Sequence, residues 1–155
     1  MEAEIQGYLT EFGIIQGDIR NAVRGLNDEA ANWRPLPADT NSIYAILNHL
    51  INSDSFWVHQ VIRGEVVPRD PATEFSASGS LPELLARWER SWADIALLLG
   101  ALTKAQLAEV KSHAFRTGPT QFVTVQWIVL HLITHHATHL GHIQLTRQLW
   151  EQRPK

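Results

Sequence analysis

The sequence contains no cysteine among its 155 residues. This absence excludes disulfide bonds, thiolate nucleophiles and thiolate metal ligands. Any metal ion must therefore bind to imidazole nitrogen or to oxygen, and any thiol that takes part in a reaction must come from a substrate.

Clustered positive charge and long apolar runs are absent as well. The chain has three lysines, no run of Lys and Arg, and a net charge of −3, so binding to the phosphate backbone of a nucleic acid is not expected. No apolar segment is long enough to span a membrane. The N-terminal segment carries three glutamates and no basic region of a signal peptide. We therefore expect a cytoplasmic protein with no nucleic-acid and no membrane partner.

The residues that are present predict a helical globular protein. Hydrophobic residues make up 45% of the chain and charged residues 19%, and the length favours a single domain over residues 1–155. Apolar residues recur at helical spacing, which predicts four helices at residues 2–25, 40–64, 80–100 and 122–151. The pattern indicates an all-α fold, a four-helix bundle whose long connections at 26–40 and 65–79 allow crossovers.

Several local features are predicted for the shorter segments. Ser80 and Glu83 have the spacing of a capping box, which predicts the start of the third helix. A short helical piece is expected at residues 103–110, and residues 111–120, which contain Gly118-Pro119, favour a loop. We expect His59 and His113 to lie on the surface.

Five of the eight histidines lie in the fourth predicted helix. At about 100° per residue, His131, His135, His139 and His142 fall on the apolar stripe that should face the core, whereas His136 points elsewhere. Residues four apart lie one turn apart on one face, so two imidazoles at this spacing can bind one metal ion. The spacing leaves two pairs open, His131 with His135 and His135 with His139.

The best candidate for a third ligand is His49, which lies among apolar residues in the second predicted helix. Three protein nitrogens leave coordination positions open for water or substrate, which is typical of catalytic metal sites. The alternatives are a chance surface pair and a purely structural helical domain with buried histidines. The zinc-protease motif does not apply, because it requires Glu directly after the first histidine and His136 stands there.

Four segments of the sequence carry a family resemblance. They are residues 26–35, residues 42–57 with His49 and Asp54, residues 81–92, and the fourth-helix residues His131, His135, His139, His142 and Arg147. Together they resemble the DinB/YfiT-like metalloprotein superfamily, in the branch related to mycothiol-dependent enzymes. The resemblance implies a four-helix bundle in which His49, His135 and His139 hold one divalent transition metal ion (zinc, nickel or iron). Gln144 departs from the acidic residue common in that branch.

The resemblance also implies an activity. Characterised members are mostly thiol-dependent transferases or isomerases, so we expect a metal-dependent enzyme that acts on a small-molecule substrate, with a low-molecular-weight thiol as the nucleophile that the chain lacks. The alternative is a non-catalytic metal- or ligand-binding bundle. The general base is not evident. The candidates for catalytic or supporting roles are Asp54, which is expected to lean into the site or to be solvated, and His131 and His142.

The fourth predicted helix is apolar beyond its core stripe. Val129, Ile133 and Leu140 lie on its far side, and a helix that is apolar all round is buried on both sides. This face is therefore expected to pack on another helix pair or to form a two-fold homodimer.

Overall fold

The computed structural model describes residues 2–36, 38–114 and 118–154. Its main elements are four long helices: α1 (Ala3–Val23), α3 (Ile43–Ser55), α5 (Leu81–Ala101) and α7 (Val125–Gln152). A π-helical stretch, η1 (Phe56–Ile62), continues α3, and the connections hold the short helices α2 (Asp28–Asn32), α4 (Pro71–Glu74) and α6 (Lys104–Leu107). The prediction of a four-helix bundle is confirmed.

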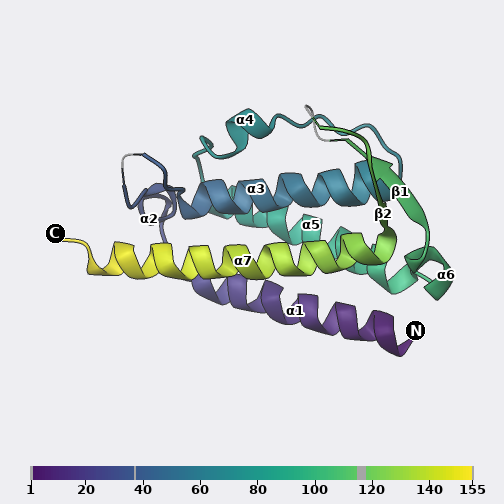
Figure 1. Ribbon diagram of the computed structural model, residues 1–155. Helices are drawn as coiled ribbons and strands as arrows, with labels where there is room; N and C mark the ends of the chain where they lie inside the picture. Colours follow the sequence, from purple (N-terminus) through teal and green to yellow (C-terminus); the bar gives the residue numbers. More distant parts are fainter. Residues whose placement is uncertain (1, 37, 115–117, 155) are drawn as a thin grey trace.

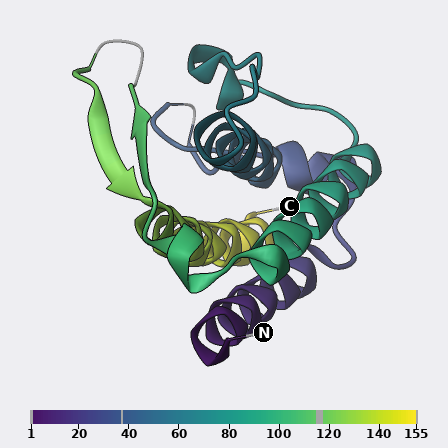
Figure 2. The ribbon, with the colours of Figure 1, turned by 90° about the vertical axis from the view of Figure 1, so that its right-hand side faces the viewer.

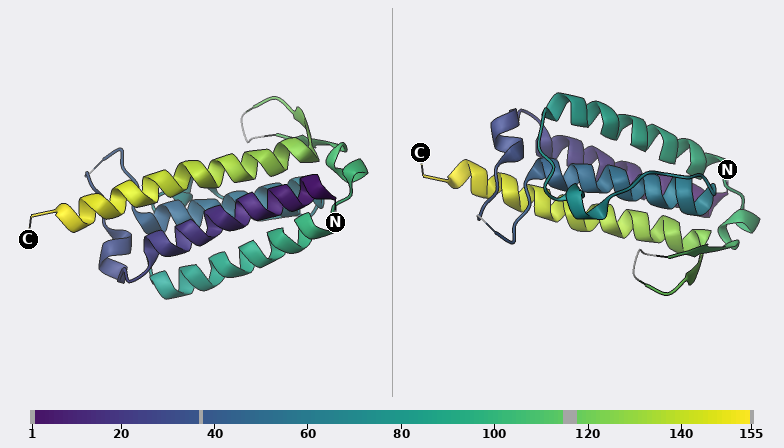
Figure 3. Two further views of the ribbon diagram at one scale, coloured as in Figure 1. Left: turned by 90° about the horizontal axis from the view of Figure 1, so that it is seen from below. Right: turned by 90° about the horizontal axis from the view of Figure 1, so that it is seen from above.

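The long helices form a bundle in which α7 packs against both α1 and α3, while α5 packs against the other sides of α1 and α3 (Figure 3). In Figure 1, α1 and α7 run in one direction along the bundle, and α3 and α5 run in the opposite direction. Because α3 and α5 are consecutive long helices that run the same way, the chain must return along the bundle between them. Residues 63–80 form this crossover and carry α4 back over α3 (Figure 1).

Polar side chains decide where the second and third long helices begin. The Ser42 hydroxyl accepts a hydrogen bond from a backbone amide of the first turn at 3.1 Å, so α3 begins just after it. The capping box predicted at Ser80 is wrong, because the Ser80 side chain caps no backbone amide. Instead, the Asp28 carboxylate, brought in from α2, accepts the N–H of Leu81 at 2.7 Å. A contact distant in sequence thus replaces the local one.

A short antiparallel hairpin begins in the segment where a loop was expected and ends in the first residues of the predicted fourth helix, so α7 begins at Val125 and not at residue 122. Strand β1 (Val110–His113) pairs with β2 (Gln121–Thr124), and the pair stands beside the start of α7 (Figure 2). Four residues are too few to display the alternation by which a strand is recognised in a sequence. His113, which was expected on the surface, is 6% exposed, and its ring packs against Phe56 and Trp57.

The apolar residues on the far side of α7 pack against other parts of the same chain. Val129 and Ile133 are buried, and Leu140 packs against the core. Because α7 contacts both α1 and α3, packing on other helices of the same chain accounts for these residues. No helix among the described residues is both long enough and apolar enough to cross a membrane.

Candidate metal centre

Three histidine side chains converge between α3 and α7. Nε2 of His135 lies 3.1 Å from Nε2 of His49 and 3.1 Å from Nε2 of His139, and one nitrogen of each ring lies within 4.8 Å of the other two. Nitrogens bound to one tetrahedral metal ion at about 2.0–2.1 Å are about 3.3 Å apart. Two of the three spacings are close to this value and the third is within 4.8 Å, so one ion can lie between the three nitrogens.

The structure also distinguishes between the two histidine pairs that the sequence left open. His135 and His139 face His49 across the helix interface. The ring of His131 instead stacks between Trp127 and His135, with centroid distances of 5.0 and 5.5 Å. His131 thus packs beside the cluster and contributes no nitrogen to it.

Burial controls the protonation of the cluster. It lowers the pKa of His135 to about 3 and that of His139 to about 4, and the neighbouring imidazoles add to the effect. Both rings are therefore neutral at pH 7, and each can offer a lone pair without first losing a proton. In the neutral rings Nε2 of His135 can donate one proton to only one of its two neighbours, so at least one lone pair of the cluster lacks a donor. A cation among the three nitrogens satisfies all of them at once.

The orientation of His49 is set by Glu74, which α4 places against it. The buried Glu74 carboxylate accepts the Nδ1–H of His49 at 2.8 Å, and this bond leaves the lone pair of His49 on Nε2. Arg69 donates two further hydrogen bonds to Glu74, at 2.6 and 3.1 Å. Burial raises the pKa of Glu74, but the hydrogen bonds from His49 and Arg69 outweigh it and hold that pKa below its ordinary value.

Glu74 and Arg69 were missed by the sequence analysis. The local signal was Asp70-Pro71, an N-cap residue followed by proline at the first helical position, which together predict a short helix. Nothing in the local sequence places that helix over His49. The crossover does so, and it also brings the ring of Phe75 to 4.5 Å from that of His49.

His142, one turn further along α7, contacts His139. Nδ1 of His142 lies 3.3 Å from Nδ1 of His139, and one of these nitrogens must donate the proton. If Nε2 of His139 binds a metal ion, its Nδ1–H donates to His142, which then orients the ring as Glu74 orients His49. The corresponding Nδ1 of His135 is buried and has no hydrogen-bond partner among the described residues.

Asp54 belongs to a different part of the interior. Its carboxylate accepts hydrogen bonds from Nε2 of His136 at 2.8 Å and from the Ser91 hydroxyl at 3.3 Å, and Gln16 bonds to the other ring nitrogen of His136. Asp54 is 2% exposed and His136 is fully buried. The expectation that Asp54 leans into the centre or is solvated is therefore corrected: it is the partner of the histidine that points away from the centre.

Comparisons with known proteins agree with this fold. The family model described as mycothiol-S-transferase matches residues 14–152. A conserved protein from Enterococcus faecalis superimposes with a TM-score of 0.79 at 14% identity, with 99% of each chain covered. YfiT from Bacillus subtilis, described as a probable metal-dependent hydrolase with an unusual four-helix bundle topology, superimposes with a TM-score of 0.74 at 16% identity, covering 96% of this chain and 89% of YfiT. At these identities the two structures show a common fold. No curated protein matches the sequence.

Proposed function

Because the chain belongs to the mycothiol-S-transferase family, we propose that it is a metal-dependent enzyme that joins a low-molecular-weight thiol to a small organic acceptor. The observation that carries the proposal is the convergence of His49, His135 and His139 on one point. We propose these three residues as the ligands of one divalent transition metal ion, either zinc, nickel or iron. Isomerisation of a substrate by the same thiol is the related alternative.

The composition supports a thiol as the second substrate. The chain has no cysteine, so it has no sulfur nucleophile of its own. When bound, a divalent metal ion acts as a Lewis acid and lowers the pKa of a thiol or water molecule that it binds. Three protein nitrogens leave a coordination position for such a molecule.

The residues around the centre have separate roles in this proposal. Glu74 and Arg69 fix the tautomer of His49, and His142 fixes that of His139, so that the metal-facing nitrogens keep their lone pairs. Phe75 packs its ring on that of His49.

The surroundings of Glu74 favour transfer of a thiol over hydrolysis. A hydrolase commonly needs a carboxylate or histidine free to take a proton from water. Glu74 is occupied by His49 and Arg69, and Asp54 by His136 and Ser91. A metal-bound thiol loses its proton readily and needs no such base. Both carboxylates are thus engaged, which leaves His131 and His142 as the candidate bases and keeps a non-catalytic metal-binding protein as the second candidate.

The test begins with the metal content of protein purified without chelator or affinity tag. We expect about one divalent ion per chain, and its absence would count against both the enzyme and the metal-binding protein. The loaded protein is then assayed for turnover with a panel of thiols against alkyl halides and epoxides. Formation of a thioether above the spontaneous rate supports the enzyme, whereas stoichiometric metal without turnover favours the binding protein.

We also propose that two copies of the chain form a homodimer through the first half of α7. Trp127 and Leu130 are each 44% exposed there, and only Arg116 is charged between Lys111 and Arg147. The solvent side of a helix normally carries charges, so an uncharged side with two large apolar residues suits a second copy. Sedimentation velocity tests this: we expect a dimer, and a monomer for Leu130→Glu. A wild-type monomer would refute the proposal.

A further inference from the structure

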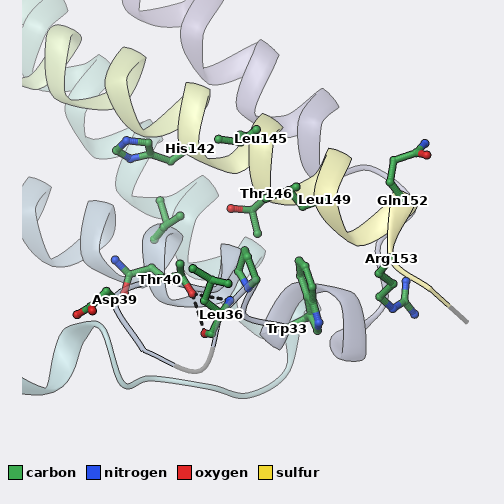
Figure 4. A pocket seen from close by; sticks show the side chains of 13 residues that line it. Trp33, Leu36, Asp39, Thr40, His142, Leu145, Thr146, Leu149, Gln152 and Arg153 are labelled. Carbon is green, nitrogen blue, oxygen red and sulfur yellow. Dashed lines mark hydrogen bonds between the residues drawn. The ribbon is translucent and has the colours of Figure 1, made fainter.

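A groove of about 620 Å³ runs along the C-terminal third of α7. Residues 33, 35, 36 and 39–41, from the connection between α2 and α3, form its opposite wall (Figure 4). Its apolar lining consists of Trp33, Pro35, Leu36, Ile46, Leu145 and Leu149. The volume lies in the range of cavities that hold small organic molecules.

One end of the groove lies at His142, which contacts the centre. His142 lines this end, and its Nδ1 lies 3.3 Å from Nδ1 of His139. On the α3 side the groove is lined by Ile46, which precedes His49 by about one helical turn. A molecule that fills the groove therefore has one end beside the centre.

The wall opposite α7 is braced by its own hydrogen bonds. The Thr40 hydroxyl donates to the Leu36 carbonyl at 2.9 Å and accepts the Leu36 N–H at 3.1 Å (Figure 4). The Arg34 guanidinium donates to the Thr40 carbonyl at 2.7 Å and also to the Phe75 carbonyl. A braced wall loses little conformational entropy when a ligand binds.

The chemistry of the lining selects an apolar ligand. Leu36, Leu145 and Leu149 are 58%, 56% and 44% exposed, so their side chains face solvent unless something covers them. The lining carries one carboxylate, from Asp39, and one guanidinium, from Arg153, which gives it no excess charge of either sign. Low-molecular-weight thiols are polar molecules, and an apolar organic body matches these walls better.

We infer that this groove binds the apolar body of the electrophile that accepts the thiol, such as a benzyl halide, and the inference rests on the proposed transferase function. In that reaction the thiol sulfur forms a bond to the benzylic carbon. The carbon–halogen bond breaks, the halide leaves with the bonding electron pair, and the thiol proton passes to solvent. The groove holds the aromatic ring and directs the benzylic carbon toward the centre at its His142 end.

Equilibrium binding of a non-reactive probe tests the groove without any turnover. The uncharged fluorophore N-phenylnaphthylamine is titrated into metal-loaded wild type, Leu145→Asp and Leu97→Asp. Leu97 is 73% exposed on α5, outside the groove lining, so its variant is a matched control. A carboxylate at position 145 must lose water when the probe binds, and we expect at least about 10-fold weaker binding for Leu145→Asp and unchanged binding for Leu97→Asp.

Steady-state kinetics then connect the groove to the reaction. For Leu145→Asp we expect a raised KM for benzyl chloride, with the KM for the thiol and the metal content unchanged. Chloroacetamide, a small polar electrophile, has no apolar ring to place in the groove, so its KM should be the same in wild type and variant.

The outcomes separate failure of this inference from failure of the proposed function. Equal probe affinity and equal KM values in wild type and Leu145→Asp overturn the groove assignment while the transferase stands. Loss of probe binding in Leu145→Asp without turnover of any thiol supports an apolar site and counts against the transferase. A wild type that binds no probe, together with a dimer that Leu145→Asp dissociates, makes the groove an interface between copies and overturns the inference.

Discussion

Glu74 accepts the Nδ1–H of His49 at 2.8 Å although the two residues lie on different helices, α4 and α3. The carboxylate is 2% exposed, and a buried carboxylate is stable only when its oxygens are well bonded. Arg69 supplies the remaining bonds and the positive charge. A hydrogen bond from a metal-binding histidine to a carboxylate fixes the ring and makes its other nitrogen more basic. In the proposed centre, α4 would therefore act on the ion through His49 without contacting it.

Glu74→Gln should therefore weaken metal binding by about 10- to 100-fold. The amide keeps the shape of the side chain but removes the negative charge that favours the Nε2 lone pair of His49 and neutralises Arg69. Competition with a chromophoric chelator measures the affinity. Glu83→Gln, an exposed change in the first turn of α5, should leave it unchanged. Equal affinities for the two variants would show that Glu74 does not position His49.

The histidine register gives a second prediction. His139→Ala removes one of the three converging nitrogens and should lower metal affinity by at least about 100-fold, more than the loss of an orienting partner does. His131→Ala is the matched control, because it makes the same substitution on the same helix but removes only a stacked ring. This variant should retain about one ion per chain. Metal analysis after dialysis distinguishes the two. If only the His131 variant lost its metal, the ligand pair on α7 would be His131 with His135 and not His135 with His139.

The sequence predicted the bundle and the histidine cluster because both follow from helical periodicity. His135 and His139 are four residues apart on one helix, and His49 lies on the apolar side of another, so their alignment depends on local geometry and on which faces are buried. The family resemblance favoured His135 with His139 over His131 with His135. The structure brings these two residues together with His49.

The parts that the sequence did not predict depend on contacts between distant segments. Glu74 reaches His49 only because the crossover turns back over α3, and Asp28 replaces Ser80 at the start of α5 for a similar reason. Asp54 and His136 form a pair between α3 and α7. A helical wheel gives the direction of each residue on its own helix, and it does not show which residue of another helix lies opposite.

The depressed pKa values of the cluster predict how the metal-free protein responds to acid. In the unfolded chain a histidine titrates near pH 6.5, whereas in the fold His135 titrates at about 3 and His139 at about 4. Between these values the unfolded chain binds more protons, so the free energy of unfolding falls as the pH falls below about 6.5. Solvent screening of the half-buried rings reduces the effect, and we expect a loss of about 1–2 kcal/mol in total between pH 7 and pH 5.

Urea unfolding of chelator-treated protein at the two pH values measures this loss. The double variant His135→Asn, His139→Asn has no titrating group at these positions and should show a smaller difference between pH 7 and pH 5. Wild type and double variant with the same dependence on pH would mean that the acid response comes from other groups.

The buried pair of Asp54 and His136 predicts a loss of stability that is independent of the metal. Asp54→Ala leaves the fully buried His136 and the Ser91 hydroxyl without an acceptor, and removing one partner of a buried pair costs about 3–5 kcal/mol. Asp94→Ala is the matched control, because Asp94 also pairs with a histidine and with Arg63 but is one-third exposed. There we expect a loss of at most about 1 kcal/mol.

Urea unfolding measures both variants, and metal affinity is measured on the same samples. The affinity should stay within about threefold of wild type in Asp54→Ala, since the carboxylate bonds to His136 and not to the three converging histidines. The sequence left Asp54 open between a position in the site and a solvated one, so the reverse result is informative. A variant as stable as wild type that binds metal but has lost thiol transfer would return Asp54 to the reaction and contradict its assignment as the partner of His136.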